Sequence, residues 1–96
     1  MKILILGAGK MGSFFVDLLS FDHETAVYDT DPKRLRFMYN TQRFTSPDEI
    51  DNFAPDLVIN AVTLKYTLEV FKQIEPHLPE HCILSDIASV KTDFHD

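Results

Sequence analysis

The chain has 96 residues, of which 45% are hydrophobic and 11% aromatic, so it can form one small domain with a modest core. Its formal net charge of −6 argues against nucleic acid or an anionic membrane as a partner. The single cysteine, Cys82, excludes an internal disulfide framework and favours a reducing, cytoplasmic location. The apolar start of the chain is soon interrupted by glycines and Lys10, so we expect no secretory signal.

The first predicted elements are a strand and a helix joined by glycines. Residues 2–6 are too few for a helix and apolar from Ile3 onward, as in a strand buried on both faces of a parallel sheet. Beyond them the apolar residues recur with helical spacing. We therefore expect a helix that begins near Gly9 and packs through Met11, Phe14, Phe15, Leu18 and Leu19.

The glycines form the pattern G-x-G-x-x-G. Gly7 would permit a tight turn, Gly9 would let the backbone approach a pyrophosphate, and Gly12 would let the helix lie close to the strand. Free N–H groups around Lys10 and Met11, at the positive end of the helix, would hold the phosphates. A turn used only for packing is the alternative, but the flanking strand, the helix and a following acidic residue favour a dinucleotide site.

That acidic residue is Asp29, which follows a second predicted strand over residues 25–28. At this place a carboxylate can accept hydrogen bonds from both hydroxyls of the adenine ribose, and it would repel a 2′-phosphate. NAD is thus favoured over NADP, although Asp29 could also serve only as a turn former. Lys33, Arg34 and Arg36 form the densest basic group. They are expected on a solvated helix face, but one of them could serve a phosphate.

The remaining elements follow from local signals. Asp31 is expected to cap a helix that begins at Pro32 and whose apolar side is Leu35, Met38 and Tyr39. Beyond it we expect, in order, an edge strand over residues 41–44, a capping box of Ser46 and Glu49 opening a helix through Phe53, a strand over 56–62, a long helix with apolar positions from Leu64 to Leu78, and a last strand over 82–86.

Strands and helices thus alternate along the chain, which predicts an α/β fold: a Rossmann-type, doubly wound parallel sheet of about five strands with right-handed crossovers. In such sheets ligands bind beyond the carboxyl ends of the strands, at the switch point between the first strand and the strand over 56–62. Ala61, Val62 and Thr63 follow the latter strand. Ser89 and Lys91 follow the last strand.

Three stretches resemble the nucleotide-binding half of prephenate dehydrogenase and arogenate dehydrogenase. They are Asp56-Leu57-Val58-Ile59-Asn60-Ala61-Val62, the helix ending in Pro76-His77-Leu78, and Ser85-Asp86-Ile87-Ala88-Ser89-Val90-Lys91. The resemblance covers essentially the whole chain, and the D-x-x-S-V-K ending is its more specific part. Thr63 stands where a proline is common, and Ala88 where a glycine is common.

The resemblance implies a cytoplasmic, homodimeric enzyme of tyrosine biosynthesis that uses NAD. Its small-molecule substrate, prephenate or arogenate, would be oxidised by hydride transfer to C4 of the nicotinamide and would lose carbon dioxide to give an aromatic ring. The backbone of residues 61–63 would border the nicotinamide. Ser89 would hydrogen-bond the ring hydroxyl or a neighbouring catalytic group, or would instead cap a helix. Lys91 is expected to be a surface or ion-pair residue rather than a catalytic one.

The same resemblance places the general base in a later His-Pro segment. His23, His77, His81 and His95 match no such motif and are expected to be merely solvated. No metal site is expected. We therefore expect residues 1–96 to be a cofactor-binding domain that lacks the helical substrate and dimerisation domain and is inactive alone.

Two other function classes fit the same pattern. Regulatory domains of potassium-uptake systems share the strand, glycine motif and acidic residue, and bind a dinucleotide without chemistry. The stretch over residues 85–91 counts against them. Another reductase or dehydrogenase, such as a pyrroline carboxylate reductase or a hydroxy-acid dehydrogenase, would share the first four strands.

Overall fold

The computed structural model describes residues 1–36, 38–39, 41–61 and 64–86. Strands and helices alternate as expected, with one additional 3-10 turn, η1. In chain order the elements are β1 (Lys2–Leu6), α1 (Lys10–Leu19), β2 (Glu24–Tyr28), α2 (Pro32–Leu35), β3 (Gln42–Phe44), α3 (Asp48–Phe53), β4 (Leu57–Asn60), α4 (Leu64–Ile74), η1 (Glu75–His77) and β5 (Ile83–Asp86).

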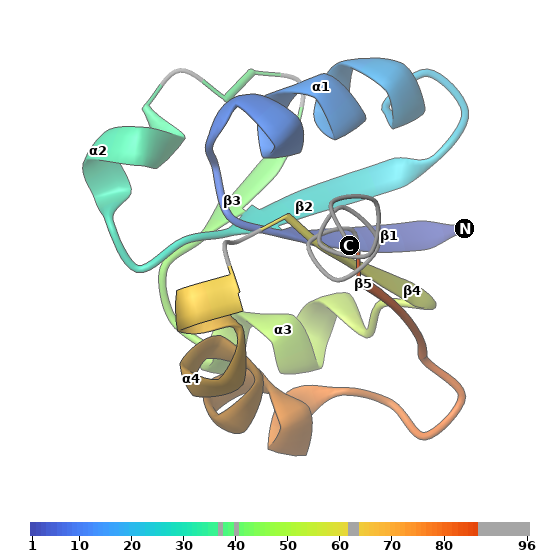
Figure 1. Ribbon diagram of the computed structural model, residues 1–96. Helices are drawn as coiled ribbons and strands as arrows, with labels where there is room; N and C mark the ends of the chain where they lie inside the picture. The colour runs from blue at the N-terminus through green and yellow to red at the C-terminus, as the bar shows by residue number, and fades with distance from the viewer. Residues whose placement is uncertain (37, 40, 62–63, 87–96) are drawn as a thin grey trace, which may run out of the picture.

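The strands form one sheet of five parallel strands in the order β3-β2-β1-β4-β5. The central strand is β1, where Ile5 lies between Val27 of β2 and Ile59 of β4. From β1 the chain builds outward to β3 and then returns to the other side of β1. Figure 1 shows α1 and α2 on one face of the sheet, and α3 and α4 on the other. The predicted doubly wound, Rossmann-type α/β fold is confirmed, with its switch point between β1 and β4.

Each face of the sheet carries its own core. Because side chains alternate along a strand, Ile3 and Ile5 face α1 and α2, whereas Leu4 and Leu6 face α3 and α4. All of β1 from Ile3 to Leu6 is at most 2% exposed. This burial on both faces explains why a continuous apolar run, rather than an alternating one, identified the strand.

The face by which α1 packs differs from the prediction. Phe14 and Leu18 are 56% and 58% exposed, whereas Val16, which was not predicted, is buried. Phe15 and Leu19 do pack against the core. The helix is rotated relative to the prediction because Gly12 lies against β1. Val16 and Leu19, four and seven residues later, are on the same face of the helix as Gly12 and therefore also face the sheet. The side chain of Met11 lies outside the described part of the structure.

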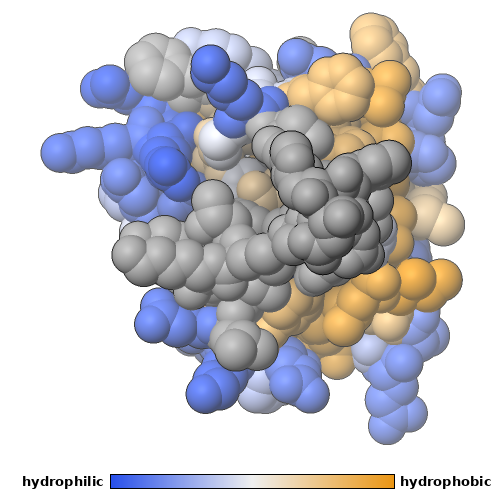
Figure 2. Space-filling view, in the orientation of Figure 1, coloured by the Kyte–Doolittle hydropathy of each residue, from blue (hydrophilic) through white to orange (hydrophobic). Residues whose placement is uncertain are grey.

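The exposed side of α1 is visible in Figure 2 as apolar surface over that helix, at the upper right. Phe14 makes an edge-to-face contact with Phe15 on the same helix, with ring centroids 5.6 Å apart. The large apolar residues that are exposed in the described part of the chain are Met1, Phe14, Leu18, Phe21, Tyr39, Ile83 and Leu84.

The start of α2 is confirmed. Pro32 is its first residue, and the Asp31 carboxylate accepts a hydrogen bond of 3.0 Å from the Lys33 N–H. Leu35 and Met38 are buried as predicted, but Tyr39 is 69% exposed, so its assignment to the packed side was wrong. It lies beyond the end of this four-residue helix, where helical spacing no longer sets the direction of a side chain.

The capping box of Ser46 and Glu49 forms, but Ser46 lies one residue before the residue that flanks α3. The Glu49 carboxylate accepts the N–H groups of Thr45 and Ser46, and the Ser46 hydroxyl oxygen accepts the Asp48 N–H. The residue that flanks the helix is nevertheless Pro47, which already has helical dihedral angles. The helix ends at Phe53 as predicted.

Three later elements are shorter than predicted. α4 ends at Ile74, and the chain continues as η1 because Pro76 has no N–H to extend an α-helix. β4 covers Leu57–Asn60, and β5 begins after Cys82.

Burial, together with the nearby charge of Asp56, raises the pKa of the Cys82 thiol, which is half-buried. Among the described residues no helix is long and apolar enough to span a membrane.

Candidate functional site

The turn between β1 and α1 depends on two of its glycines for its shape. Gly7 has a φ of 95°, which glycine adopts without strain, and its N–H donates to the Tyr28 carbonyl at 2.9 Å. A Cβ added at Gly12 would lie 2.0 Å from the Gly7 carbonyl oxygen. The tight turn at Gly7 and the close helix–strand packing at Gly12 are therefore confirmed.

Gly9 has a different environment. It precedes α1 with ordinary extended angles (φ −78°, ψ −164°), and a Cβ built on it would meet no heavy atom of the described residues within 4 Å. The first N–H groups of α1, including those of Lys10 and Met11, have no acceptor within the helix. Open space thus lies beside the positive end of a ten-residue helix, which suits an anion.

Asp29 lies at the end of β2 and is 8% exposed. One carboxylate oxygen accepts the Ala8 N–H at 3.0 Å, and the other accepts the Asp31 N–H at 2.9 Å. The Arg34 guanidinium lies 3.7 Å from the first of these oxygens. A carboxylate offers about four acceptor positions, so Asp29 can still accept hydrogen bonds from a ligand.

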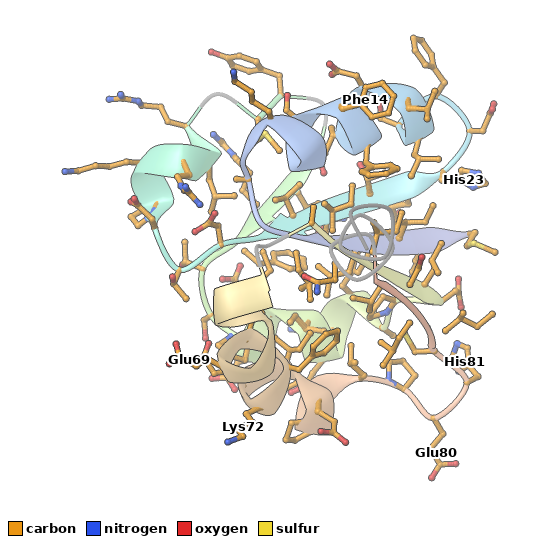
Figure 3. All side chains as sticks on the ribbon, in the orientation of Figure 1. Phe14, His23, Glu69, Lys72, Glu80 and His81 are labelled. Carbon is orange, nitrogen blue, oxygen red and sulfur yellow. The ribbon has the colours of Figure 1, made fainter. Side chains whose placement is uncertain are left out.

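Asp29 and Gly7, the first glycine of the turn, line one cavity of about 390 Å³. One wall consists of Gly7, Tyr28, Asp29, Thr30, Asp31 and Arg34, and the other consists of Glu69, Val70 and Gln73 of α4. Figure 3 shows Glu69 on α4, on the side of the molecule where that helix begins. The Tyr28 hydroxyl donates to the Gln73 side-chain oxygen at 3.1 Å and joins the two walls. Burial, and secondarily the charge of Asp29, raises the pKa of Tyr28, so the phenol remains a neutral donor.

A second cavity of about 530 Å³ lies on the α1 and α2 side of the same turn. Cationic side chains from both helices border it. Its lining residues are Ala8, Gly9, Lys10, Ser13, Lys33, Arg34 and Met38. Arg34 borders both cavities. It is therefore not merely a residue of a solvated face, although it is 58% exposed.

Of the residues predicted to border the nicotinamide, the structure describes one. Ala61 follows β4 and donates its N–H to the Leu6 carbonyl at 2.9 Å, so it lies beside the end of β1. Val62, Thr63, Ser89 and Lys91 lie outside the described residues. The roles assigned to all of them remain predictions.

The described histidines lie away from the glycine turn and Asp29. Figure 3 shows His23 and His81 on the side away from Glu69. His77 and His81 pair with the carboxylates of Asp51 and Asp56, each at 2.9 Å, so the expectation that they are merely solvated was wrong. The buried Nδ1 of His23 has no hydrogen-bond partner among the residues that the structure describes. His95 lies outside the described residues.

One group of side chains could in principle approach a metal ion. Ligand atoms of Asp48, Asp51 and His77 lie within 4.8 Å of one another. Both carboxylates are exposed, and His77 already pairs with Asp51. Since exposed acidic groups commonly occur together without an ion, this group does not by itself make a metal site, and the absence of one stays a prediction.

The wall contributed by α4 was missed from the sequence. Glu69 and Gln73 are four residues apart, so they lie on one side of the helix that follows the switch-point strand. That spacing was the available signal. It is common on solvated helices and becomes informative only once α4 is known to lie across from β2.

Solved structures of dehydrogenases resemble this chain. A prephenate dehydrogenase from A. aeolicus, solved with hydroxyphenyl propionate and NAD+, is 24% identical, with a TM-score of 0.77 over 90% of this chain and 32% of its own. An arogenate dehydrogenase from Synechocystis is 20% identical, with a TM-score of 0.75 over 93% of this chain and 33% of its own. The chain has a Rossmann-type fold.

The likeness to prephenate and arogenate dehydrogenases is thus confirmed as a likeness of structure. This Rossmann-type domain spans about one third of the length of those two enzymes. The fold also occurs in a Rex-family repressor, which is 15% identical, with a TM-score of 0.69 over 98% of this chain and 56% of its own. No protein-family model matches the chain, and no curated protein matches its sequence.

Proposed function

We propose that the chain is the cofactor-binding domain of an NAD-dependent prephenate or arogenate dehydrogenase. The observation that carries the proposal is that Asp29 lines one cavity with Gly7 at the switch point of the sheet and accepts the N–H of Ala8 in the glycine turn. The likeness to both enzymes supports the choice of family. So does the resemblance of residues 56–62 and 85–91 to the same enzymes.

The described residues fit NAD. The open space beside Gly9 admits a pyrophosphate to the first N–H groups of α1. Asp29 would accept both hydroxyls of the adenine ribose, with the adenosine in the cavity of about 390 Å³. The backbone around Ala61 would border the nicotinamide, because it follows the strand beside β1.

When bound, NAD supplies an acceptor for hydride at C4 of its nicotinamide. The chain's own residues bind and orient the cofactor: α1 compensates the phosphate charge, and Asp29 fixes the ribose. We assign Ser89 a hydrogen bond to the substrate hydroxyl. The base belongs to the rest of the proposed enzyme, which we further propose to be cytoplasmic and homodimeric.

Titration calorimetry tests the cofactor assignment. A charge-assisted hydrogen bond contributes about 1.5–3 kcal/mol, so Asp29→Ala should weaken NAD binding about tenfold or more and NADP binding less. Asp17→Ala, which removes an exposed carboxylate on the outer part of α1, is the matched control and should change neither. Tighter binding of NADP than of NAD by the unmodified chain would show that Asp29 does not select the cofactor.

Turnover tests the assignment of the reaction. Residues 1–96 should bind NAD and produce no NADH from prephenate or arogenate, since orientation of a substrate contributes about 7–11 kcal/mol and a positioned base about 10²–10⁴-fold. A longer version that includes the proposed substrate domain should be active. Activity of residues 1–96 alone would refute the proposal that the substrate site and the base lie in another domain. Inactivity of a folded, NAD-saturated longer version with both substrates would refute the family.

The alternative is a domain that senses a dinucleotide without chemistry. A Rex-family repressor, which is a regulator by its name, has the same fold, so the fold alone does not exclude this alternative. The same turnover assay separates the two, since a sensor would bind NAD in every version and oxidise neither substrate.

A further inference from the structure

On one face of the sheet, the last two strands carry no helix of the described chain. The helices of that face are α1 and α2, and α1 packs over β1 and β2. Ile83 of β5 pairs with Leu57 of β4, and Leu57 packs into the same core as Ile3, so both side chains are on the α1 side of the sheet. Ile83 is 63% exposed. The described helices thus leave β4 and β5 uncovered on this side.

The exposed side of α1 adjoins these two strands. Gly12 faces β1, and Ser13, about 100° further around the helix, borders the cavity beside α2. Phe14 and Leu18 come about 200° and 240° after Gly12, so they point outward and toward β4 rather than toward α2. Both are more than half exposed. In Figure 2 apolar surface accordingly continues from α1 down the same side of the molecule. We call the following four residues the uncovered face: Phe14, Leu18, Leu57 and Ile83.

The dimensions of the uncovered face fit one helix. Neighbouring strands lie about 4.7–4.9 Å apart and an α-helix with its side chains is about 10–12 Å across, so β4 and β5 together match the width of a single helix. In α/β folds a parallel sheet is covered by helices on both faces. A helix laid beside α1 would complete that layer. Its side toward the sheet must be aliphatic or aromatic, because it would contact Leu18 from the side and Ile83 from above.

The position of this face favours the substrate domain of the proposed enzyme as the source of that helix. β4 leads to Ala61, which the proposed function places beside the nicotinamide. A domain fixed on β4 and β5 would therefore hold its groups next to the reacting end of the cofactor. The dehydrogenases that resemble this chain match it over about one third of their length, so two thirds of each lie outside the match.

We propose that the uncovered face is the docking surface for one amphipathic helix of that substrate domain. The inference rests on the proposed function, because the substrate domain is itself part of that proposal. Docking buries Leu18 and Ile83 and fixes the substrate domain against the strand that borders the nicotinamide. A second copy of this chain is the competing occupant, and the experiment below distinguishes it.

Thiol labelling of the longer version, which includes the substrate domain, tests the inference. Leu18→Cys and Ile83→Cys, each combined with Cys82→Ala, place a thiol on the uncovered face. Tyr39→Cys in the same background is the matched control, because Tyr39 is 69% exposed and lies beyond α2. Reaction with N-ethylmaleimide is followed by mass spectrometry of the peptide that carries the new cysteine. Each rate is divided by the rate of the same variant in urea, which cancels the intrinsic reactivity of the thiol.

The two thiols of the uncovered face should react at least tenfold more slowly than the Tyr39→Cys thiol, because a covered thiol reacts only when the interface opens. Residues 1–96, which lack the proposed substrate domain, should give similar relative rates at all three positions. Slow labelling of Leu18→Cys in residues 1–96 would overturn the inference. Protection that grows with concentration would then assign the face to a second copy, and protection at every concentration would assign it to residues 1–96 themselves.

The remaining outcomes separate this inference from the proposed function. Equal relative rates at all three positions of the longer version would overturn the inference, and the proposed function would stand if that version oxidises prephenate or arogenate. A protected face in a version that oxidises neither substrate would uphold the docking of a second domain and refute the proposed reaction.

Discussion

Alanine at Gly9 and at Gly12 adds the same methyl group at two points of one turn, and we expect opposite results. In the described part of the chain, a Cβ at position 9 would meet no heavy atom within 4 Å, whereas one at position 12 would lie 2.0 Å from the Gly7 carbonyl oxygen and 3.6 Å from the Ile5 side chain. Gly7 has little freedom to retreat, because its N–H is bonded to the Tyr28 carbonyl. Gly12→Ala should therefore unfold more easily, and Gly9→Ala should lose only ligand binding.

The magnitudes follow from opposing terms. At Gly12, overpacking costs about 1–3 kcal/mol, near the upper end here because the contact is with backbone, and better helix propensity returns about 1 kcal/mol. The net loss of about 2 kcal/mol lowers the Tm by roughly 8–16 °C in a domain of this size. At Gly9, a poorer helix cap costs about 0.5–1 kcal/mol, and a less flexible unfolded chain returns a similar amount. Its Tm should move by less than about 4 °C.

Thermal unfolding followed by circular dichroism, with NAD titration of the same samples, measures both effects. Gly9→Ala should weaken NAD at least tenfold, because losing one charge-assisted hydrogen bond to the pyrophosphate costs about 1.5–3 kcal/mol. Normal NAD binding by that variant would refute the phosphate position. A Gly12→Ala variant that melts with the unmodified chain would refute the tight contact with Gly7.

Two other positions offer direct tests of stability. Ala54 ends α3 with a φ of 50°, so Ala54→Gly should stabilise the fold by about 0.5–1 kcal/mol, and an unchanged or lower Tm would contradict the left-handed conformation. The Lys2 N–H, and secondarily His81, hold the pKa of Asp56 below its ordinary value. The native carboxylate therefore stabilises the fold above its unfolded pKa of about 4, and this contribution is lost as the pH falls through the lower native value. Urea unfolding between pH 3 and 7 should show a flatter acid dependence for Asp56→Ala, while His81→Ala retains most of it. Parallel curves for Asp56→Ala and the unmodified chain would exclude the carboxylate as the cause.

The bounds of an element could be predicted from the sequence where a local residue pattern has a single structural explanation. The bounds of β1 follow from an apolar run that ends at a glycine, and the start of α2 from Asp31 before Pro32. The packed face of α1 could not be read in this way. Hydropathy assigns Gly12 no weight, yet its lack of a side chain is what brings the helix against β1 and turns Phe14 outward.

The residues of the candidate site likewise fall into those that the sequence identifies and those that only the fold brings together. Asp29 and the glycines could be named from the sequence because they follow consecutive strands at a fixed place in the motif. Glu69 and Gln73 could not, because only the strand order brings α4 across from β2. The double position of Arg34, between two cavities, likewise depends on how α2 lies against the turn.

The hydrogen bond from the Ala8 N–H to Asp29 has a consequence for how cofactor preference can change in this protein. The carboxylate that would select the ribose also fastens the glycine turn to the end of β2, so the two properties share one residue. Replacing Asp29 by a small neutral residue to admit NADP removes that anchor as well, and both cofactors lose part of the preformed turn. An amide at this position gives up the negative charge and loses the bond from the Asp31 N–H, but its oxygen can still accept the Ala8 N–H that fastens the turn. A path from one cofactor to the other that preserves affinity should therefore pass through Asp29→Asn rather than through alanine or glycine.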